Sequence, residues 1–237
     1  MRDLPFPDPV PALVTMHVWR VAAGSVPAAV ARMATHRRPL RRTGGLRFAK
    51  LLGTGRAFTL RDADPCQWGL LATWRSRRDA DDFEGSAVLR SWRRIATEEW
   101  RLGLTPLSAR GRWSRRAPFG TPKPAHWRGR VAALTRARIA PAKAVRFWRA
   151  VPAVAADLAG RPGLLAAVGV GEAPIGVQGT FSVWRNAEDL TAFAYRDTPH
   201  QTAIARTSTE GWYAEELFAR FGVLDSVGTF RGSDPVT

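Results

Sequence analysis

The sequence has almost none of the residues that cross-link a protein or bind a structural metal. Cys66 is the one cysteine among 237 residues, which excludes an internal disulfide and makes a reduced, cytoplasmic setting the default. It offers no CxxC pair either, so a structural zinc site is not expected. No stretch approaches the about 18 consecutive apolar residues of a membrane-spanning helix. The N-terminus also lacks the pattern of a secretory signal, so we expect a cytoplasmic protein.

Several common catalytic motifs are missing as well. The sequence contains no GxxxxGK[ST] loop and no GxSxG elbow, so it is not expected to be a P-loop enzyme or a hydrolase of the elbow type. Two glycine-rich turns occur, at residues 53–55 and 169–171. A strand is predicted after each, whereas a dinucleotide-binding turn opens a helix. These turns therefore favour tight or bulged strand ends over a dinucleotide site.

Acidic residues are scarce relative to basic ones. There are 36 lysines and arginines against 20 acidic residues, a net charge of +16. This excess predicts attraction to anions, such as nucleic acid, acidic lipid headgroups or an acidic protein partner. A GC-rich genome that writes arginine for lysine is the alternative explanation. The basic residues are spread over both halves, and no nucleic-acid module signature occurs, so nucleic acid is not an expected partner.

What the sequence does contain is a duplicated pattern. The segment QWGLLATWRSRRDADDF (67–83) matches VQGTFSVWRNAEDLTAF (177–193) at a constant spacing. Each copy predicts a strand that ends in Trp-Arg, a polar turn and a helix that buries an aromatic residue. The matched pairs are Gly69 and Gly179, Trp74 and Trp184, Arg75 and Arg185, Asp79 and Asp189, and Phe83 and Phe193. A repeat this long indicates two similar units rather than a solenoid.

Hydrophobic periodicity and turn residues give both copies the order βαββαβ, which is the ferredoxin-like arrangement. In the first copy, strands are predicted at 13–21, 46–52, 68–74 and 104–113, and helices at 26–37, 79–83 and 87–101. In the second, strands are predicted at 129–138, 164–170, 177–184 and 223–231, and helices at 141–158, 188–195 and 199–221. The predicted fold class is α+β, with two tandem ferredoxin-like units that form an intrachain dimeric α/β barrel. We divide the chain into a first unit (13–113), a Pro/Gly-rich linker (114–128) and a second unit (129–231), with residues 1–12 and 232–237 loosely held.

The side chains that could bind a cofactor are few. Four histidines are available: His17, His36, His126 and His200. His200 follows a proline at a predicted helix start, where an ordinary hydrogen-bonding role is the simpler interpretation. Tryptophan and phenylalanine are abundant in the second copy, where core packing accounts for most of them and a hydrophobic ligand pocket for a few.

Several ordered segments resemble the spheroidene monooxygenase family. They are FAKLLGTG (48–55), LSARGRWSRRAPF (107–119), ALTRARI (133–139), FWRAVP (147–152), VGVGEAP (168–174), QGTFSVWRNAEDLTAFAYRDTPHQTAI (178–204) and EGWYAEELFARF (210–221). The similarity covers most of residues 14–230. A broader resemblance is to the dimeric α/β barrel proteins.

The resemblance implies a haem-dependent monooxygenase that inserts oxygen from O₂ into a carotenoid or similar apolar isoprenoid, with electrons from a ferredoxin-type donor. His200 is the one histidine inside a family motif, and it is therefore the expected iron ligand. Phe193 and Trp184 would supply an apolar wall, and Arg196 and Lys50 would pair with the haem propionates. The basic surface would contact an anionic membrane from its cytoplasmic side. The alternative is a haem- or lipid-binding protein of the same fold without catalysis.

Overall fold

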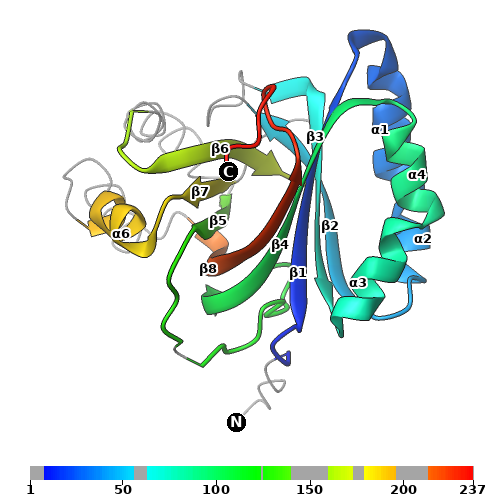
Figure 1. The fold of residues 1–237 in the computed structure, drawn as a ribbon. Helices are drawn as coiled ribbons and strands as arrows, with labels where there is room; N and C mark the ends of the chain where they lie inside the picture. Colours follow the sequence, from blue (N-terminus) through cyan, green and yellow to red (C-terminus); the bar gives the residue numbers. More distant parts are fainter. Residues whose placement is uncertain are drawn as a thin grey trace.

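The computed structural model describes residues 8–55, 63–123, 125–139, 160–172, 179–195 and 213–236. Its centre is one closed barrel of eight antiparallel strands (Figure 1). The strands are β1 (Leu13–Val21), β2 (Leu46–Gly55), β3 (Ala63–Trp74), β4 (Ala96–Gly111), β5 (Val131–Ile139), β6 (Leu164–Gly171), β7 (Gly179–Trp184) and β8 (Tyr213–Gly228). The described helices are α1 (Val26–Thr35), α2 (Arg37–Arg41), α3 (Arg77–Glu84), α4 (Ala87–Arg93) and α6 (Ala187–Tyr195), with a short 3₁₀ turn at Ala23–Ser25.

Strand order shows that the two halves of the barrel are alike. Around the barrel the first half reads β4-β1-β3-β2 and the second reads β8-β5-β7-β6, which is the same ferredoxin-like order twice. The halves join through β2 with β6 and β4 with β8, both antiparallel. The predicted α+β fold class and intrachain barrel are confirmed. The unit boundaries at 113/114 and 128/129 stay a prediction.

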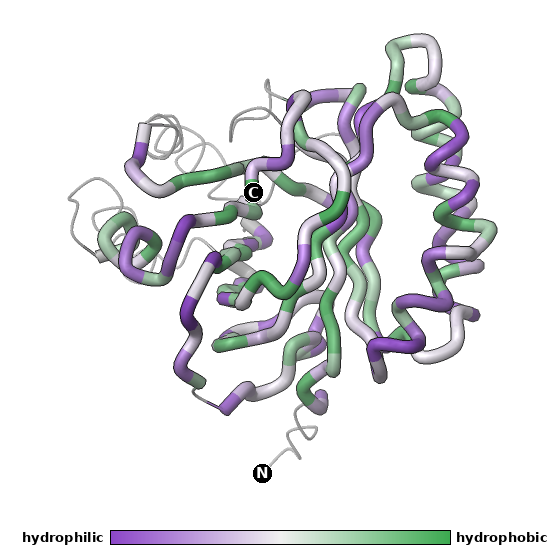
Figure 2. Tube along the Cα trace, viewed as in Figure 1, coloured by the Kyte–Doolittle hydropathy of each residue, from purple (hydrophilic) through white to green (hydrophobic). Residues whose placement is uncertain are grey.

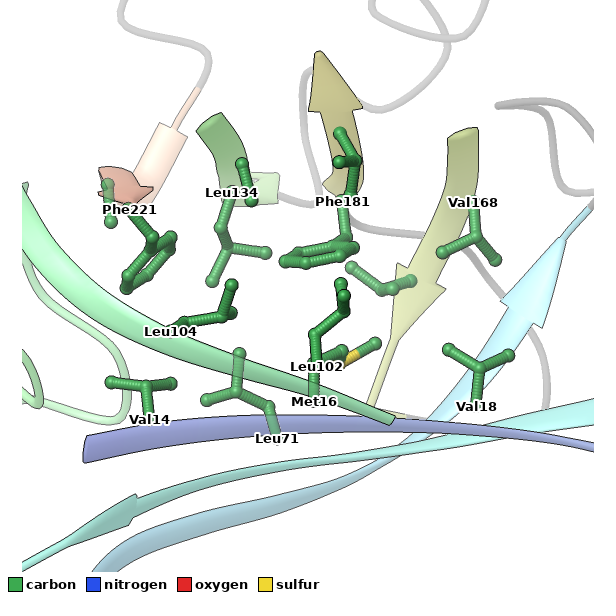
Figure 3. Close-up of a cluster of buried hydrophobic side chains, with 14 of the residues drawn as sticks. Val14, Met16, Val18, Leu71, Leu102, Leu104, Leu134, Val168, Phe181 and Phe221 are labelled. Atoms are coloured by element: carbon green, nitrogen blue, oxygen red, sulfur yellow. The ribbon is translucent and has the colours of Figure 1, made fainter. Parts of the chain in front are cut away.

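The barrel interior is a hydrophobic core built by strand alternation. Because successive side chains of a strand point to opposite faces, every second residue of each strand points inward. Hydrophobic and hydrophilic residues accordingly alternate along the strands (Figure 2). The inward-pointing side chains meet in the middle of the barrel (Figure 3). Those that are at most 3% exposed and labelled there are Val14, Met16, Val18, Leu71, Leu102, Leu104, Leu134, Val168, Phe181 and Phe221.

Two predicted helices were wrong in part, and the error is the same in both halves. The helix predicted at 87–101 ends at Arg93, and β4 begins at Ala96. The helix predicted at 199–221 is strand β8 from Tyr213 onward; residues 199–212 lie outside the described part of the chain, as does the helix predicted at 141–158. Both segments contain EE followed by a hydrophobic run, whose spacing also suits a helix. Packing in the barrel makes this segment a strand, since every second residue, Leu217, Ala219 and Phe221, points into the core.

Each half ends in a hook that closes one mouth of the barrel. After β4, Trp113 pairs with Arg116 and Phe119 is fully buried; after β8, Phe230 pairs with Ser233 and Val236 is 7% exposed. Each hook is bound by a glutamate of the other half. Glu215 accepts the backbone N–H groups of Ser114 and Arg115, and Glu98 accepts that of Gly232. The expectation that residues 232–237 are loosely held was therefore wrong for 232–236, because they repeat the first hook.

Candidate functional site

The tryptophan and phenylalanine of the duplicated pattern form the same contact in both halves. Trp74 packs on Phe83 with ring centres 4.9 Å apart, and Trp184 packs on Phe193 at 5.2 Å. Both pairs lie on the outer face of their half of the sheet, under α3 and α6 respectively. The structure therefore brings the predicted wall residues Trp184 and Phe193 together. Because the pair is repeated, it does not by itself distinguish a ligand site from a core.

The outer face of the first half-sheet is filled by large side chains. His17 and Trp19 on β1 are both fully buried there, opposite Leu70 and Trp68 of β3. Trp92 from α4 stacks on Trp19 with ring centres 4.9 Å apart and planes within 5°. Helix and sheet in this half therefore meet through stacked indoles, which leave no room for another planar group.

The register identifies the matching positions in the second half. Leu13 pairs with Trp74 and Val131 pairs with Trp184, so His17 corresponds to Thr135 and Trp19 to Ala137. Leu70 likewise corresponds to Thr180, which lies opposite Thr135.

On the next strand, β2 of the first half pairs Leu51 with Leu70. At the matching place in the second half, β6 pairs Gly169 with Thr180. All of the large side chains at these four positions are thus replaced by small ones. Thr135 is exposed, although His17 is fully buried. The second half therefore carries small side chains where the first carries large ones; Thr135 is exposed, whereas Ala137 and Gly169 are buried.

Aromatic and aliphatic side chains border this part of the sheet at one end. They are Val131, Trp184, Leu190 and Phe193, with Trp127 of the predicted linker packed beside them. Gly222 of β8 is required there, because a Cβ at this position would lie 2.4 Å from the Trp127 ring. We refer to the outer face of β5, β6 and β7 together with this border as the open face.

Lys50 lies away from the open face. It points to the inner side of β2, 5.6 Å from the ring centre of Phe48 and 5.8 Å from that of Trp113. Its Nζ lies 2.5 Å from Glu172 Oε2 and donates to Ser114 Oγ at 2.6 Å. The structure thus separates Lys50 from Trp184 and Phe193, on the opposite side of the sheet.

Lys50 belongs to a charged network at one barrel mouth that links the two halves. Arg136, which is 4% exposed, contacts Glu172 at 2.8 Å and Glu215 at 2.5 Å. Trp113 Nε1 donates to Glu172 Oε1 at 2.6 Å. Burial acts to raise the pKa of the Glu172 carboxyl, but hydrogen bonds from Lys50 and Trp113 and the charges of Lys50 and Arg136 outweigh it and lower the pKa. Lys50 therefore joins the halves through Glu172.

His17 is held within the filled core of the first half. Its ring stacks on Trp19 at 5.4 Å, and its Nδ1 lies 3.4 Å from Glu99 Oε1. Burial acts to raise the pKa of the Glu99 carboxyl, but hydrogen bonds with His17 and Arg93 and their charges lower it to about 2. His36 packs edge-on against Trp92, and His126 is exposed in the linker. His200 and Arg196 lie outside the described residues.

A separate cavity of about 610 Å³ opens beside the C-terminal hook, lined by Arg20, Asp64, Gln67, Glu98, Arg231 and Gly232. Its lining is mostly charged and polar, unlike the aromatic border of β5–β7. Among the described residues, no helix is long and apolar enough to cross a bilayer.

The sequence interpretation missed the open face. The four small residues Thr135, Ala137, Gly169 and Thr180 form no motif of their own. A single small residue in a strand does not indicate a site. Position-by-position alignment of the two halves is the signal that could have found them. It requires the strand register, which the structure supplies.

Fold and register together define a class: a single-chain dimeric α/β barrel whose two units share a strand order and differ in the side chains on their outer sheet faces. Solved structures share the fold. A crystal structure of aldoxime dehydratase covers 96% of this chain and 90% of its own with a TM-score of 0.59 at 11% identity. A second aldoxime dehydratase, in complex with butyraldoxime, aligns with a TM-score of 0.57 at 9% identity over 95% of this chain and 87% of its own. These likenesses show the fold alone.

Sequence relatives are more specific. Spheroidene monooxygenase of Rhodobacter capsulatus is 39% identical over 220 residues, 90% of both chains. The Rubrivivax gelatinosus protein of that name is 40% identical over 79% of this chain and 73% of its own, and the Cereibacter sphaeroides protein is 37% identical over 78% and 57%. No family model matches the chain. The chain belongs to the spheroidene monooxygenase family, which confirms the predicted family and its assignment as a monooxygenase-type oxidoreductase.

Proposed function

We propose that this protein is a haem-dependent monooxygenase that inserts oxygen from O₂ into a carotenoid or similar apolar isoprenoid. The observation that carries the proposal is the open face: within a duplicated fold, one unit has lost the side chains that fill the other. Family membership supports the reaction class, since the relatives are named for spheroidene.

The residues of the open face suit the cofactor and its substrate in chemical terms. Trp184 and Phe193 form a stacked aromatic wall, and Ala137 and Gly169 are small residues on the same sheet face. Haem would supply the activation of O₂, which no side chain can perform. His200, from the family motif, is the proposed iron ligand, with a neutral imidazole nitrogen toward the metal.

The protein's own part in the reaction is to bind, orient and exclude water. An apolar chain laid against the open face would be held by the aromatic rings at its border and lose contact with solvent. The hydroxyl groups of Thr135 and Thr180 lie on the sheet opposite each other in register, and Ser182 on the same face accepts a hydrogen bond from Trp184 Nε1. Two partners are implied besides the substrate: a ferredoxin-type electron donor, and an anionic membrane contacted peripherally, where carotenoids dissolve.

The test is to purify the protein with haem supplied during expression and record its absorption spectrum. A Soret band, together with conversion of a carotenoid that requires O₂ and reduced ferredoxin, is the expected result. A Soret band without conversion of any carotenoid offered, acyclic or cyclic, would favour the non-catalytic haem-binding alternative. A protein that converts carotenoid while free of haem would overturn the cofactor assignment.

A further inference from the structure

The two hooks share a backbone but differ in charge. Gly111 and Gly228 match, both with φ of +88°, and each lies so close to a backbone oxygen of the facing strand that a Cβ would not fit. Four arginines of the first hook and of the strand end before it have uncharged counterparts in the second. They are Arg110, Arg112, Arg115 and Arg116, at the places of Val227, Thr229, Gly232 and Ser233, while Arg231 stands at the place of Ser114. Because the second hook folds without these four, the shared backbone does not require them.

One of the four, Arg116, has a structural partner. It contacts Asp8 at 3.0 Å and donates to the carbonyl of Arg47 at 2.9 Å, so it ties the hook to the N-terminal segment and to the start of β2. The charge of Arg116 is therefore compensated, which sets it apart from the other three.

Arg110, Arg112 and Arg115 are exposed, and no carboxylate is paired with any of them within the part of the chain that the structure describes. The guanidinium carbon of Arg110 lies 4.4 Å from the ring centre of Phe218. Arg112 donates to the Arg115 carbonyl at 3.2 Å. These contacts position two of the side chains without neutralising their charge.

The buried acidic groups of this barrel mouth are already engaged. Glu215 accepts the backbone N–H groups of the hook and contacts Arg136 at 2.5 Å. Glu172 is shared between Arg136 and Lys50. Two cations thus balance two anions inside this network, and it has no negative charge left to compensate the exposed arginines of the hook.

A further cation lies beside the hook. Arg138 is exposed at the end of β5, opposite Glu215 in register. Glu216, which is half-buried on β8 and accepts the Arg112 backbone N–H at 2.6 Å through its carbonyl, is the acidic residue that adjoins these side chains. Four exposed cations beside one carboxylate leave this mouth positive. We refer to Arg110, Arg112, Arg115 and Arg138 as the mouth arginines.

A surface of this kind fits an acidic protein better than a bilayer. Exposed complementary charge mainly raises the association rate and selects the partner, and electron-transfer proteins form small, transient interfaces. Peripheral membrane surfaces combine basic residues with large apolar side chains that insert among the lipids. The exposed large hydrophobic residues of the described chain, Val10, Val30, Leu224 and Val227, all lie outside the first hook.

We propose that the mouth arginines form the docking surface for an acidic redox protein that supplies the electrons of the reaction. The role of this partner as an electron donor rests on the proposed function, whereas its acidic character rests on the charges of the mouth. The partner would dock on β4, β5 and β8, at a seam where the two units join.

Binding of a negatively charged plant-type [2Fe–2S] ferredoxin to the purified protein tests the proposal, and calorimetric titration measures it without turnover. Wild type is expected to bind at about 0.01 M salt and to weaken toward about 0.15 M, because the screening length falls from about 30 Å to about 8 Å. The triple variant Arg110→Gln, Arg112→Gln, Arg115→Gln should bind about tenfold more weakly, on the scale of three exposed charge pairs, and should depend less on salt. In turnover assays its KM for ferredoxin should rise while kcat is kept.

A matched control removes the same charge from α2. The triple variant Arg37→Gln, Arg38→Gln, Arg41→Gln should bind ferredoxin as wild type does. Absence of binding by wild type at low salt, or equal weakening in both variants, would overturn the proposal. So would a hook variant that keeps its affinity for ferredoxin and loses binding to phosphatidylglycerol vesicles, since the mouth arginines would then belong to a membrane surface.

Failure of the proposed function has a different signature. A protein that shows neither a Soret band nor conversion of carotenoid, but still binds ferredoxin through the mouth arginines, would remove the proposed reaction and keep the docking surface.

Discussion

The two halves of this barrel share strand order, register and hooks, yet they use their outer faces differently. In the first unit, Trp19 and Trp92 stack between sheet and helix, and His17 is buried against Glu99. In the second, the positions of His17 and Trp19 are Thr135 and Ala137. The two copies thus share a fold but pack side chains of different size on their outer faces, and the proposed function assigns the ligand to the second.

The comparison also shows which shared features are structural. Trp74 with Phe83 and Trp184 with Phe193 make the same contact, although the first pair lies in a filled core. An aromatic pair of this kind therefore belongs to the fold. Under the proposed function, the positions at which the copies diverge carry the activity, so the variants that test it change those positions.

The largest expected effect comes from the histidines. His200→Ala should abolish the Soret band and the oxygenase activity together, because the proposed iron ligand is lost, while circular dichroism stays native. His17→Ala should keep the Soret band and lower the free energy of unfolding instead, since it removes a fully buried ring from the core and one of the hydrogen-bond partners of Glu99.

The exposed linker residue His126 provides the control, and His126→Ala should change neither property. Haem spectra and urea unfolding of the three variants separate the roles. Full haem occupancy in His200→Ala would transfer the ligand role elsewhere, and loss of haem in His17→Ala would place it in the first unit.

The next effect comes from giving the second unit the side chains of the first. Ala137→Trp should prevent haem binding, because the indole would occupy the space proposed for the ring. Thr135→Leu is a milder variant at an exposed position and should weaken haem binding without unfolding the protein. The reverse change, Trp19→Ala, should lower the free energy of unfolding by about 3–5 kcal/mol through the cavity it leaves, with haem stoichiometry unchanged at one per chain.

Haem titration and urea denaturation measure both directions of this exchange. If Ala137→Trp and Thr135→Leu bind haem as wild type does, the open face is not its site. If Trp19→Ala bound a second haem, the large side chains of the first unit would be the one feature that keeps it from binding haem as the second unit does.

How much of this the sequence could reveal depends on the range of the interactions involved. The repeat made the two ferredoxin-like units and Trp184 with Phe193 predictable, because these follow from local patterns. The helix predicted through Glu98 and Glu99 was wrong, since the pairing of β4 with β1 and β8 is a long-range property that overrides local periodicity. The open face needed the register between strands, and Lys50 needed the position of Glu172, which is far away in sequence.

A smaller effect concerns acid stability, and its clearest case is Glu99 of the first unit. The pKa of Glu99 is lowered to about 2 from an ordinary value of 4.5. A lowered pKa in the folded state contributes stability that is complete above the unfolded value and is lost as pH falls from about 4.5 toward 2. Glu99→Gln should therefore flatten the dependence of the free energy of unfolding on pH in this range. The control Asp82→Asn, at a side chain that is 74% exposed, should leave the slope close to that of wild type.

The smallest expected effect concerns the basic surface. The exposed arginines of α2 and the turn after it, Arg37, Arg38, Arg41 and Arg42, lie on the outer helical layer of the first unit, and α1, α2 and α4 contain no acidic residue. If this face contacts an anionic membrane, replacing all four with glutamine should weaken binding to phosphatidylglycerol vesicles by roughly 1 kcal/mol for each charge near the surface. Binding should also fall with salt, because exposed charges are screened beyond about 10 Å at 0.1 M. Sedimentation with anionic and neutral vesicles measures this, and equal binding to both, or an unchanged fourfold variant, would leave codon composition as the explanation of the charge.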